Sequence, residues 1–207
     1  MAQFFSIHPI DPQPRLIARA AEIVRSGGVI AYPTDSCYAL GCRVGDKDAM
    51  VRMRRIRGMD DQRHLTLMCR DLSEIGVYAN VDNARFRLLK QLTPGSYTFI
   101  LPASREVPRR LMHPRRRTIG VRVPDHPVAQ ALLAELDEPL LSATLILPGD
   151  EHPLNDPDEI RRRLEKLVEL VLDAGACGIE PSTVVDLTGA VPEIVRIGKG
   201  AVDPVRN

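Results

Sequence analysis

The stretch AYPTDSCYALG, residues 31–41, joins two apolar segments through a very short connection. A plain two-residue hairpin would carry Asn-Gly or Asp-Gly at this point. This connection instead begins with a proline and then places four polar or reactive side chains in a row: Thr34, Asp35, Ser36 and Cys37. The short return predicts that its two flanking strands are antiparallel neighbours, and the polar run indicates that something polar is held there.

Outward from this loop, the apolar periodicity alternates between helix and strand. Helical spacing predicts helices over 14–26, 46–57, 82–92, 127–136 and 157–167, with Asp46 as an N-cap and Gly27 and Gly28 as a left-handed stop. Strand-like segments cover 29–32, 38–44, 65–69, 97–101, 118–123, 140–147, 168–172, 182–187 and 193–197. This alternation predicts a single α/β domain over residues 1–207, built on a mixed sheet of about seven strands.

Composition places the chain among ordinary globular proteins. Of its 207 residues, 44% are hydrophobic and 27% are charged. There is no Trp, and there are only four Phe and four Tyr, which argues against a stacking platform for single-stranded nucleic acid. No apolar run approaches about 18 residues and the N-terminus lacks a secretory signal, so we expect no membrane span and a cytoplasmic location.

Several common kinds of site are excluded by the residues. The cysteines Cys37, Cys42, Cys69 and Cys177 are scattered without a C-x-x-C pair, which is typical of reduced, partly buried thiols. Because zinc sites need closely spaced ligands, we expect no protein-bound metal. The sequence also lacks a P-loop, a G-x-G-x-x-G fingerprint, an H-E-x-x-H pair and a G-x-S-x-G elbow.

Charge is nearly balanced overall but uneven along the chain. The net charge is +1, yet basic clusters occupy 52–57 and 109–117, while acidic residues gather at 150–159. A local basic face on a nearly neutral protein indicates an anionic ligand, either small or polymeric. The alternative is that these arginines are solvated residues at helix and loop surfaces.

Polar side chains recur at strand ends and in connecting loops, where α/β proteins bind ligands. Besides the loop at 34–36, they occur in RIRGMDDQRHL (55–65), TPGSYTFIL (93–101), TIGVRVPDHP (118–127), EPSTVVDL (180–187) and EIVRIGKG (193–200). Arg122 lies in an otherwise apolar strand, so it either pairs with a carboxylate or faces a ligand. Ser182 and Thr183 are either an ordinary turn or part of a phosphate or carboxylate site.

Taken in order, these segments resemble the YrdC/YciO family, which includes the threonylcarbamoyl-AMP synthases. The resemblance runs over nearly the whole chain, from RAAEIVRSGGVIAYPTDSCYALG (19–41) to EIVRIGKGAV (193–202). LMCRDLSE, NARFRLLK and TLILPG look closest to the YciO branch. The resemblance implies a three-layer, YrdC/RibB-like α/β fold around a twisted mixed sheet of about seven strands, with one open basic cleft.

The activity that this resemblance implies is the condensation of L-threonine, bicarbonate and ATP, with Mg²⁺, into threonylcarbamoyl-AMP and pyrophosphate. That intermediate feeds the threonylcarbamoyladenosine modification of tRNA. No side-chain nucleophile is needed, because the carbamate of threonine attacks the α-phosphorus. A nucleotidyltransferase of this kind contributes positioning and neutralisation of phosphate charge, which fits a sequence rich in arginine and poor in catalytic motifs.

The family's motifs also imply roles for individual residues. A catalytic, charge-neutralising role is implied for Arg57 and Arg63. The residues implied to bind threonine are Thr34, Ser36, Tyr38, Arg63, Arg122 and Ser182. The residues implied to bind the nucleotide are Arg57, Thr118, Thr144 and Arg196.

Two motifs of the synthases are incomplete in this chain. Arg57 replaces the lysine of K-x-R, Met59 replaces its arginine, and Ala143–Ile146 replaces S-x-N. Because a hydrogen bond to a charged group is worth about 1.5–3 kcal/mol, these losses predict a weak or diverged synthase.

The sequence leaves two other functions open. The first is binding of double-stranded RNA or tRNA through the same cleft and the basic residues Arg109, Arg110, Arg115, Arg116 and Arg117. The second is binding of a metabolite by a protein that has lost catalysis. Steep salt dependence with RNA would favour the first, and nucleotide turnover would favour the enzyme.

Overall fold

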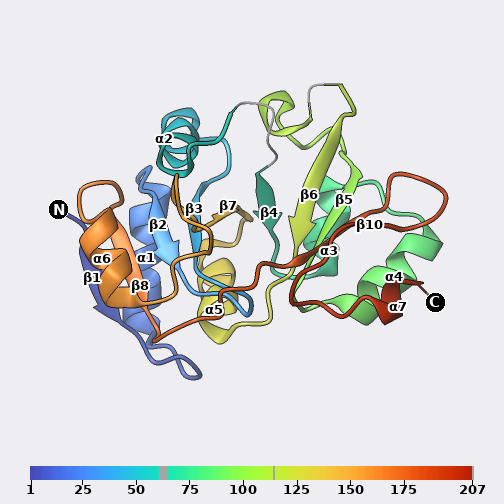
Figure 1. Cartoon of the computed structure of the whole chain (residues 1–207). Helices are drawn as coiled ribbons and strands as arrows, with labels where there is room; N and C mark the ends of the chain where they lie inside the picture. The colour runs from blue at the N-terminus through green and yellow to red at the C-terminus, as the bar shows by residue number, and fades with distance from the viewer. Residues whose placement is uncertain (61–64, 114, 207) are drawn as a thin grey trace.

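The strands pair into one mixed sheet (Figure 1). The computed structural model describes residues 1–60, 65–113 and 115–206. Within these ranges ten strands follow the order β1-β8-β2-β3-β7-β4-β6-β5-β9-β10. The strands are β1 (Gln3–Ser6), β2 (Ile30–Tyr32), β3 (Ala39–Arg43), β4 (Thr66–Met68), β5 (Tyr97–Pro102), β6 (Thr118–Arg122), β7 (Leu140–Thr144), β8 (Leu170–Asp173), β9 (Thr183–Asp186) and β10 (Glu193–Arg196).

The prediction of about seven strands is wrong, because the sheet has ten strands in the described chain. Each strand-like segment of the sequence forms a strand, and the N-terminal residues QFFS add β1. This strand of four residues pairs in parallel with β8, with Phe4 opposite Val171. So short a strand at a sheet edge carries too little alternation to be recognised from sequence.

The short return at Pro33 makes β2 and β3 antiparallel neighbours, as the sequence predicts. Tyr32 lies opposite Ala39 at the loop end of this pair. A Cβ at Gly41 would lie 2.5 Å from a side-chain carbon of Leu140 and 2.8 Å from a ring carbon of Tyr32. Only glycine fits this approach, so Gly41 allows β3 to pass beneath the tyrosine ring.

Helices cover both faces of the sheet and give the three expected layers. The helices are α1 (Pro14–Arg25), α2 (Lys47–Arg57), α3 (Leu72–Tyr78), α4 (Asn83–Leu92), α5 (Pro127–Leu136), α6 (Pro157–Leu164) and α7 (Asp203–Arg206). α1 and α5 pack over one face, against strand residues such as Ile30, Leu140 and Leu170. The neighbouring residues Ala31 and Leu141 belong to the other core layer, which includes side chains of α2, α3, α4 and α6.

Capping residues determine where α2 begins and ends. The Asp46 side chain accepts the N–H of Ala49 at 2.9 Å, which confirms it as the N-cap. Gly58 ends the helix in the left-handed conformation, with φ at 59°, directly after Arg57. At the end of α1, Gly27 has the left-handed conformation predicted for it, with φ at 86°.

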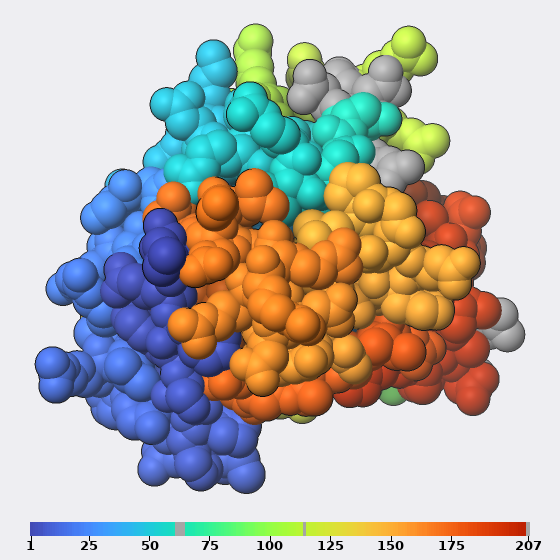
Figure 2. Space-filling model, turned by 60° about the vertical axis from the view of Figure 1, so that its left-hand side comes forward, coloured from blue at the N-terminus to red at the C-terminus, as the bar shows by residue number. Residues whose placement is uncertain are grey.

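The N-terminal strand packs beside α6 at one end of the sheet. In Figure 2 the N-terminal residues (blue) lie against the segment around α6 (orange). The guanidinium of Arg161, on α6, lies 4.9 Å from the ring centroid of Phe4, on β1. This contact joins the last predicted helix to the strand that the sequence pattern missed.

The cysteines agree with the expectation of free, partly buried thiols. Cys37, Cys42 and Cys69 are buried and Cys177 is half-buried, and all four are free. Within the described ranges, every helix is too short or too polar to cross a membrane.

Candidate functional site

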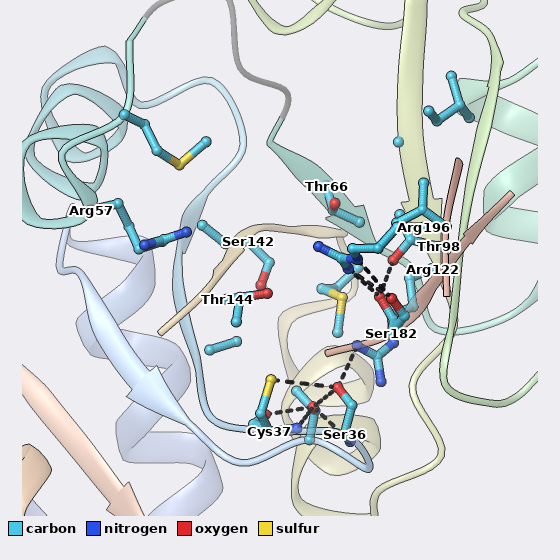
Figure 3. Close-up of a pocket in the computed structure, with 18 residues that line it drawn as sticks. Ser36, Cys37, Arg57, Thr66, Thr98, Arg122, Ser142, Thr144, Ser182 and Arg196 are labelled. Carbon is cyan, nitrogen blue, oxygen red and sulfur yellow. Dashed lines mark hydrogen bonds between the residues drawn. The ribbon is translucent and has the colours of Figure 1, made fainter. Parts of the chain in front are cut away.

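A cavity of about 460 Å³ lies where the β2–β3 loop, the end of α2 and the central strands meet (Figure 3). Four neighbouring strands turn residues two apart toward it: Thr66 and Met68 of β4, Thr98 and Ile100 of β5, Gly120 and Arg122 of β6, and Ser142 and Thr144 of β7. Residues two apart share one face of a strand, so one face of the sheet forms most of the wall. We call this cavity the central pocket.

The turn that opens the central pocket is held by its own threonine. Thr34 Oγ1 donates to the Cys37 carbonyl at 2.7 Å and accepts the N–H groups of Ser36 at 3.2 Å and Cys37 at 3.3 Å. A threonine used in this way replaces a backbone turn. Thr34 and Ser36 are 3% and 0% exposed, so the turn is a rigid edge of the pocket.

Arg122 is a buried cation of the pocket, and Asp35 is its partner. Arg122 Nη2 donates to Asp35 Oδ1 at 2.6 Å, and Nη1 donates to Ser36 Oγ at 3.0 Å. In the described chain, Arg122 Nε is buried without a hydrogen-bond partner. Both alternatives left open by the sequence therefore apply, since Arg122 forms a salt bridge and also lines the cavity.

Asp35 is held by donors from two other loops. Ser96 Oγ donates to Oδ2 at 2.5 Å, and the N–H of Asp125 donates to Oδ1 at 3.1 Å. Burial by itself raises the pKa of the Asp35 carboxyl, but the charge of Arg122 and these hydrogen bonds outweigh it and lower the pKa below its usual value. Asp35 is therefore ionised at neutral pH and holds the Arg122 fork in one orientation.

Arg196 reaches the pocket from the last strand and is tied to the residue before β9. Its Nη2 and Nε donate to the Ser182 carbonyl at 2.7 and 3.2 Å. The Ser182 hydroxyl shares a hydrogen bond with Thr98 Oγ1 at 2.7 Å. Figure 3 shows Arg196, Arg122 and Ser182 on one side of the pocket and Arg57 on the other. Guanidinium groups on two sides suit a ligand with more than one anionic group.

The wall near Arg57 contains the residues that depart from the synthase motifs. Arg57 Nη1 donates to the carbonyl of Ile146. Met59 and Ala143 line the pocket with apolar side chains, and Thr144 adds one hydroxyl. This wall therefore offers fewer polar groups than complete K-x-R and S-x-N motifs would offer.

The fold brings most of the predicted site residues together. Those that line the central pocket are Thr34, Ser36, Arg57, Arg122, Thr144, Ser182 and Arg196. Arg63 lies outside the described residues. Residues from both ends of the chain thus meet at one cavity.

Tyr38 and Thr118 are not among the described residues that line this pocket. The Tyr38 hydroxyl donates to the Gly175 carbonyl at 2.8 Å and accepts the N–H of Ala174 at 3.3 Å. Tyr38 therefore ties the start of β3 to the loop after β8. Thr118 is 4% exposed and lies at the opposite end of β6 from Arg122.

The predicted set omits several polar groups of the pocket. It also omits Asp35, which lies beside the pocket and pairs with Arg122; its signal in the sequence is a carboxylate between two hydroxyl residues in a short connection. Thr98 and Ser142 lie inside apolar strands, where no local pattern singles them out. Cys37 also lines the pocket, and burial raises the pKa of its thiol, which is therefore neutral at pH 7.

The basic run at 109–117 lies apart from the central pocket and is divided by the fold. Arg109 and Arg117 line a different cavity. Arg110 donates to the carbonyl of Gly45. Arg115 and Arg116 are exposed and line neither cavity. Adjacent arginines in the sequence therefore face different surroundings.

A single mixed sheet between helical layers, with an arginine-rich pocket on one face of the sheet, defines an α/β protein with a small-molecule site. The chain belongs to the Sua5/YciO/YrdC family, since residues 22–198 match the model of that family, which is described as "Telomere recombination".

Known relatives agree with this assignment. The chain is 58% identical over 204 residues to the Escherichia coli (strain K12) protein named "Uncharacterized protein YciO", covering 99% of both chains. The crystal structure of E. coli YciO matches with a TM-score of 0.96 over 99% of this chain and 100% of that chain. A Chromobacterium violaceum protein named threonylcarbamoyl-AMP synthase is 36% identical over 86% of this chain and 92% of its own length. P. abyssi Sua5 complexed with L-threonine matches at 26% identity with a TM-score of 0.86, over 94% of this chain and 57% of Sua5.

Proposed function

We propose that this protein is a nucleotidyltransferase of the threonylcarbamoyl-AMP synthase type. It condenses L-threonine, bicarbonate and ATP into threonylcarbamoyl-AMP and pyrophosphate, for tRNA modification in the cytoplasm. The observation that supports this most directly is the meeting of Arg57, Arg122 and Arg196 at one cavity lined with hydroxyl groups. The 36% identity to a protein named as such a synthase supports the same reaction.

The threonine would bind at the rigid side of the pocket, near Asp35 and Arg122. A carboxylate there would accept the N–H of Arg122 Nε, the buried donor that has no partner in the described chain. The hydroxyls of Thr34, Ser36 and Ser182 border the same space. The similarity to a Sua5 structure complexed with L-threonine supports a threonine site in this fold.

The phosphates would lie between Arg57 and Arg196, on opposite sides of the pocket. Arg63 belongs to this proposal as the additional cation that the family resemblance implies. The threonine amine takes up carbon dioxide derived from bicarbonate, and an oxygen of the resulting carbamate attacks the α-phosphorus while pyrophosphate leaves. The guanidinium groups stabilise the charge on the phosphates, and no side chain forms a covalent bond with the substrate.

Magnesium would enter with ATP and not as a resident ion of the protein. No described residue that lines the pocket is a carboxylate, and Asp35 beside it is already engaged by Arg122 and Ser96. Hard cations such as Mg²⁺ prefer oxygen ligands and keep several waters while they bridge phosphates. The donor set thus supports a metal bound mainly by the nucleotide.

Turnover should be slow compared with a synthase that has complete motifs. Met59 offers no charge where K-x-R has an arginine, and Ala143–Ile146 offers no amide. Each missing charge-assisted contact in the transition state costs about 1.5–3 kcal/mol, or roughly a factor of ten to a hundred in rate.

The decisive test incubates the pure protein with ATP, L-threonine, bicarbonate and Mg²⁺. Pyrophosphate release and the adenylate, detected by mass, should both appear and should both require threonine. The Chromobacterium violaceum synthase is the positive control, and the Arg122→Gln variant of this chain is the negative control. Absence of the adenylate at high enzyme concentration would contradict the proposal.

A second candidate function is binding of double-stranded RNA or tRNA by the basic surface outside the pocket. The supporting observation is the exposure of Arg109, Arg115, Arg116 and Arg117 along one connection. Phosphate-led binding of this kind falls steeply with salt. A shallow salt slope, or binding unaffected by replacing these arginines, would count against it.

A further inference from the structure

The connection between β5 and β6 encloses a second cavity, of about 770 Å³. The described parts of this connection, residues 103–113 and 115–117, lie at the top of Figure 1, to the right of α2. The charged side chains that line the cavity are Arg105, Arg109 and Arg117, and His113 lies beside them. Of the described residues that line it, none is acidic and none lines the central pocket. We call this cavity the β5–β6 cavity.

Several residues that line the β5–β6 cavity join it to the end of α3 and the residues that follow. The N–H of Asn80 donates to the Pro102 carbonyl at 2.9 Å, and Asn80 Nδ2 donates to the Ala103 carbonyl at 3.2 Å. Ser104 Oγ donates to the Val77 carbonyl at 2.6 Å. Val107, which also lines the cavity, is only 2% exposed. The cavity is therefore part of the packed fold and not a gap under a loose loop.

Backbone geometry in the second half of the connection places Arg117 and His113 at the cavity. Arg117 has φ at 53°, a left-handed conformation that costs a non-glycine residue about 1–2 kcal/mol. It is held there by hydrogen bonds from its N–H to the His113 carbonyl and from the N–H of Ala103 to its own carbonyl. His113 Nδ1 accepts the N–H groups of Arg115 and Arg116 at 3.2 and 3.1 Å, which fixes the orientation of the ring at the cavity.

The arginines of the β5–β6 cavity differ from many others in the molecule because they have no ion-pair partner among the described residues. Arg43 pairs with Glu138 at 2.8 Å and Arg163 with Asp150 at 3.0 Å. The three cavity arginines, by contrast, have neither an ion pair nor a side-chain hydrogen bond with any described residue. Like charges gathered at one cavity repel one another, and a ligand of opposite charge relieves that repulsion.

We propose that the β5–β6 cavity binds a small multivalent phosphate anion, such as pyrophosphate or the phosphate tail of a nucleotide, independently of the central pocket. Guanidinium forks match phosphate oxygens, and a cavity of this volume can hold a nucleotide-sized ligand. Three positions far apart in the connection converge on one concave site. A duplex would instead need cations spread over an open surface.

The test titrates the full-length protein with pyrophosphate and follows the heat of binding. Arg105→Ala, Arg109→Ala and Arg117→Gly should each weaken one binding step by about tenfold, the loss of one charge-assisted contact. Glycine is chosen at position 117 because it accepts the left-handed backbone without strain. The Arg196→Ala variant should leave this step unchanged.

The matched control removes two arginines of the same run that lie outside the cavity. Arg115→Ala with Arg116→Ala should change this pyrophosphate step by less than twofold, although it removes more charge than any single cavity variant. An equal loss in this control, or no saturable step that depends on the cavity arginines, would overturn the proposal. The proposal would also be overturned if the protein bound a short RNA duplex but not pyrophosphate, and if the RNA binding depended equally on the three cavity arginines and on the two control arginines.

Discussion

Replacing Asp35 with asparagine would leave the Arg122 guanidinium buried beside a neutral amide. The change keeps the size and shape of the side chain, so the acceptor for Arg122 Nη2 and the position of Ser96 can both persist. What is lost is the negative charge, and with it the compensation for the buried cation. Asp35→Asn therefore isolates the electrostatic part of the interaction.

The burial of the pair sets the size of the expected effect. The side chains of Arg122 and Asp35 are 7% and 11% exposed. Removing one partner of a buried pair costs about 3–5 kcal/mol, and the retained amide hydrogen bond puts Asp35→Asn near the lower value, about 3 kcal/mol. For a chain of 207 residues this corresponds to a fall in Tm of roughly 6–12 °C. A solvent-exposed pair would cost about 1 kcal/mol at most.

Urea unfolding at pH 7 measures this difference directly. Asp35→Asn should lower the midpoint without changing the m-value, which would indicate a loss of stability with unchanged compactness. Asp125→Asn is the matched control, because Asp125 is exposed and contacts Asp35 only through its backbone N–H, which the substitution keeps. That control should stay within about 0.5 kcal/mol of the wild type. A loss below about 1 kcal/mol for Asp35→Asn, or equal losses for both variants, would refute the reasoning.

Further predictions concern pH, the pocket cations and one glycine. Folding lowers the pKa of the Asp35 carboxyl, so the ionised carboxylate stabilises the folded protein fully above the pKa of the unfolded chain, near 4. That stabilisation is lost as the pH falls through the lower pKa of the folded protein. The urea midpoints of the wild type and of Asp35→Asn should therefore converge below about pH 4 and stay apart above it. Arg196→Ala should weaken ATP binding by about tenfold or more in equilibrium dialysis, while unfolding in urea changes little; unchanged affinity would remove Arg196 from the phosphate site. Met59→Arg should raise the rate of pyrophosphate release several-fold if the proposed reaction is correct, and Met59→Leu, its uncharged control, should not. Gly58→Ala should destabilise the protein by about 1–2 kcal/mol more than Gly149→Ala. Both glycines have positive φ, but only an alanine at position 58 would place its Cβ 2.8 Å from a side-chain carbon of Pro148. Equal losses of stability would mean that backbone strain alone decides the effect.

The type of most elements followed from the sequence, because the spacing of apolar residues is local information. Apolar spacing predicted α1, α2, α4, α5 and α6 and all but one of the described strands, and Asp46 marked a helix start through its own side chain. It did not predict α3 and α7, which have seven and four residues and are too short to show a helical period. The polar loop at 34–37 and the arginine inside the apolar strand β6 marked two parts of the pocket. β1 escaped detection because four residues carry too little alternation, and its partner β8 lies near the other end of the chain.

Which groups meet was decided only by the tertiary structure. Asp35 and Arg122 are 87 positions apart, and the pairing of β3, β7, β4 and β6 brings them within hydrogen-bonding distance. The basic run at 109–117 looks uniform in the sequence, yet the fold separates the arginines that line the β5–β6 cavity from those that do not. Periodicity records which face of an element is buried, whereas sheet order and loop conformation depend on contacts between distant segments, which no local pattern contains.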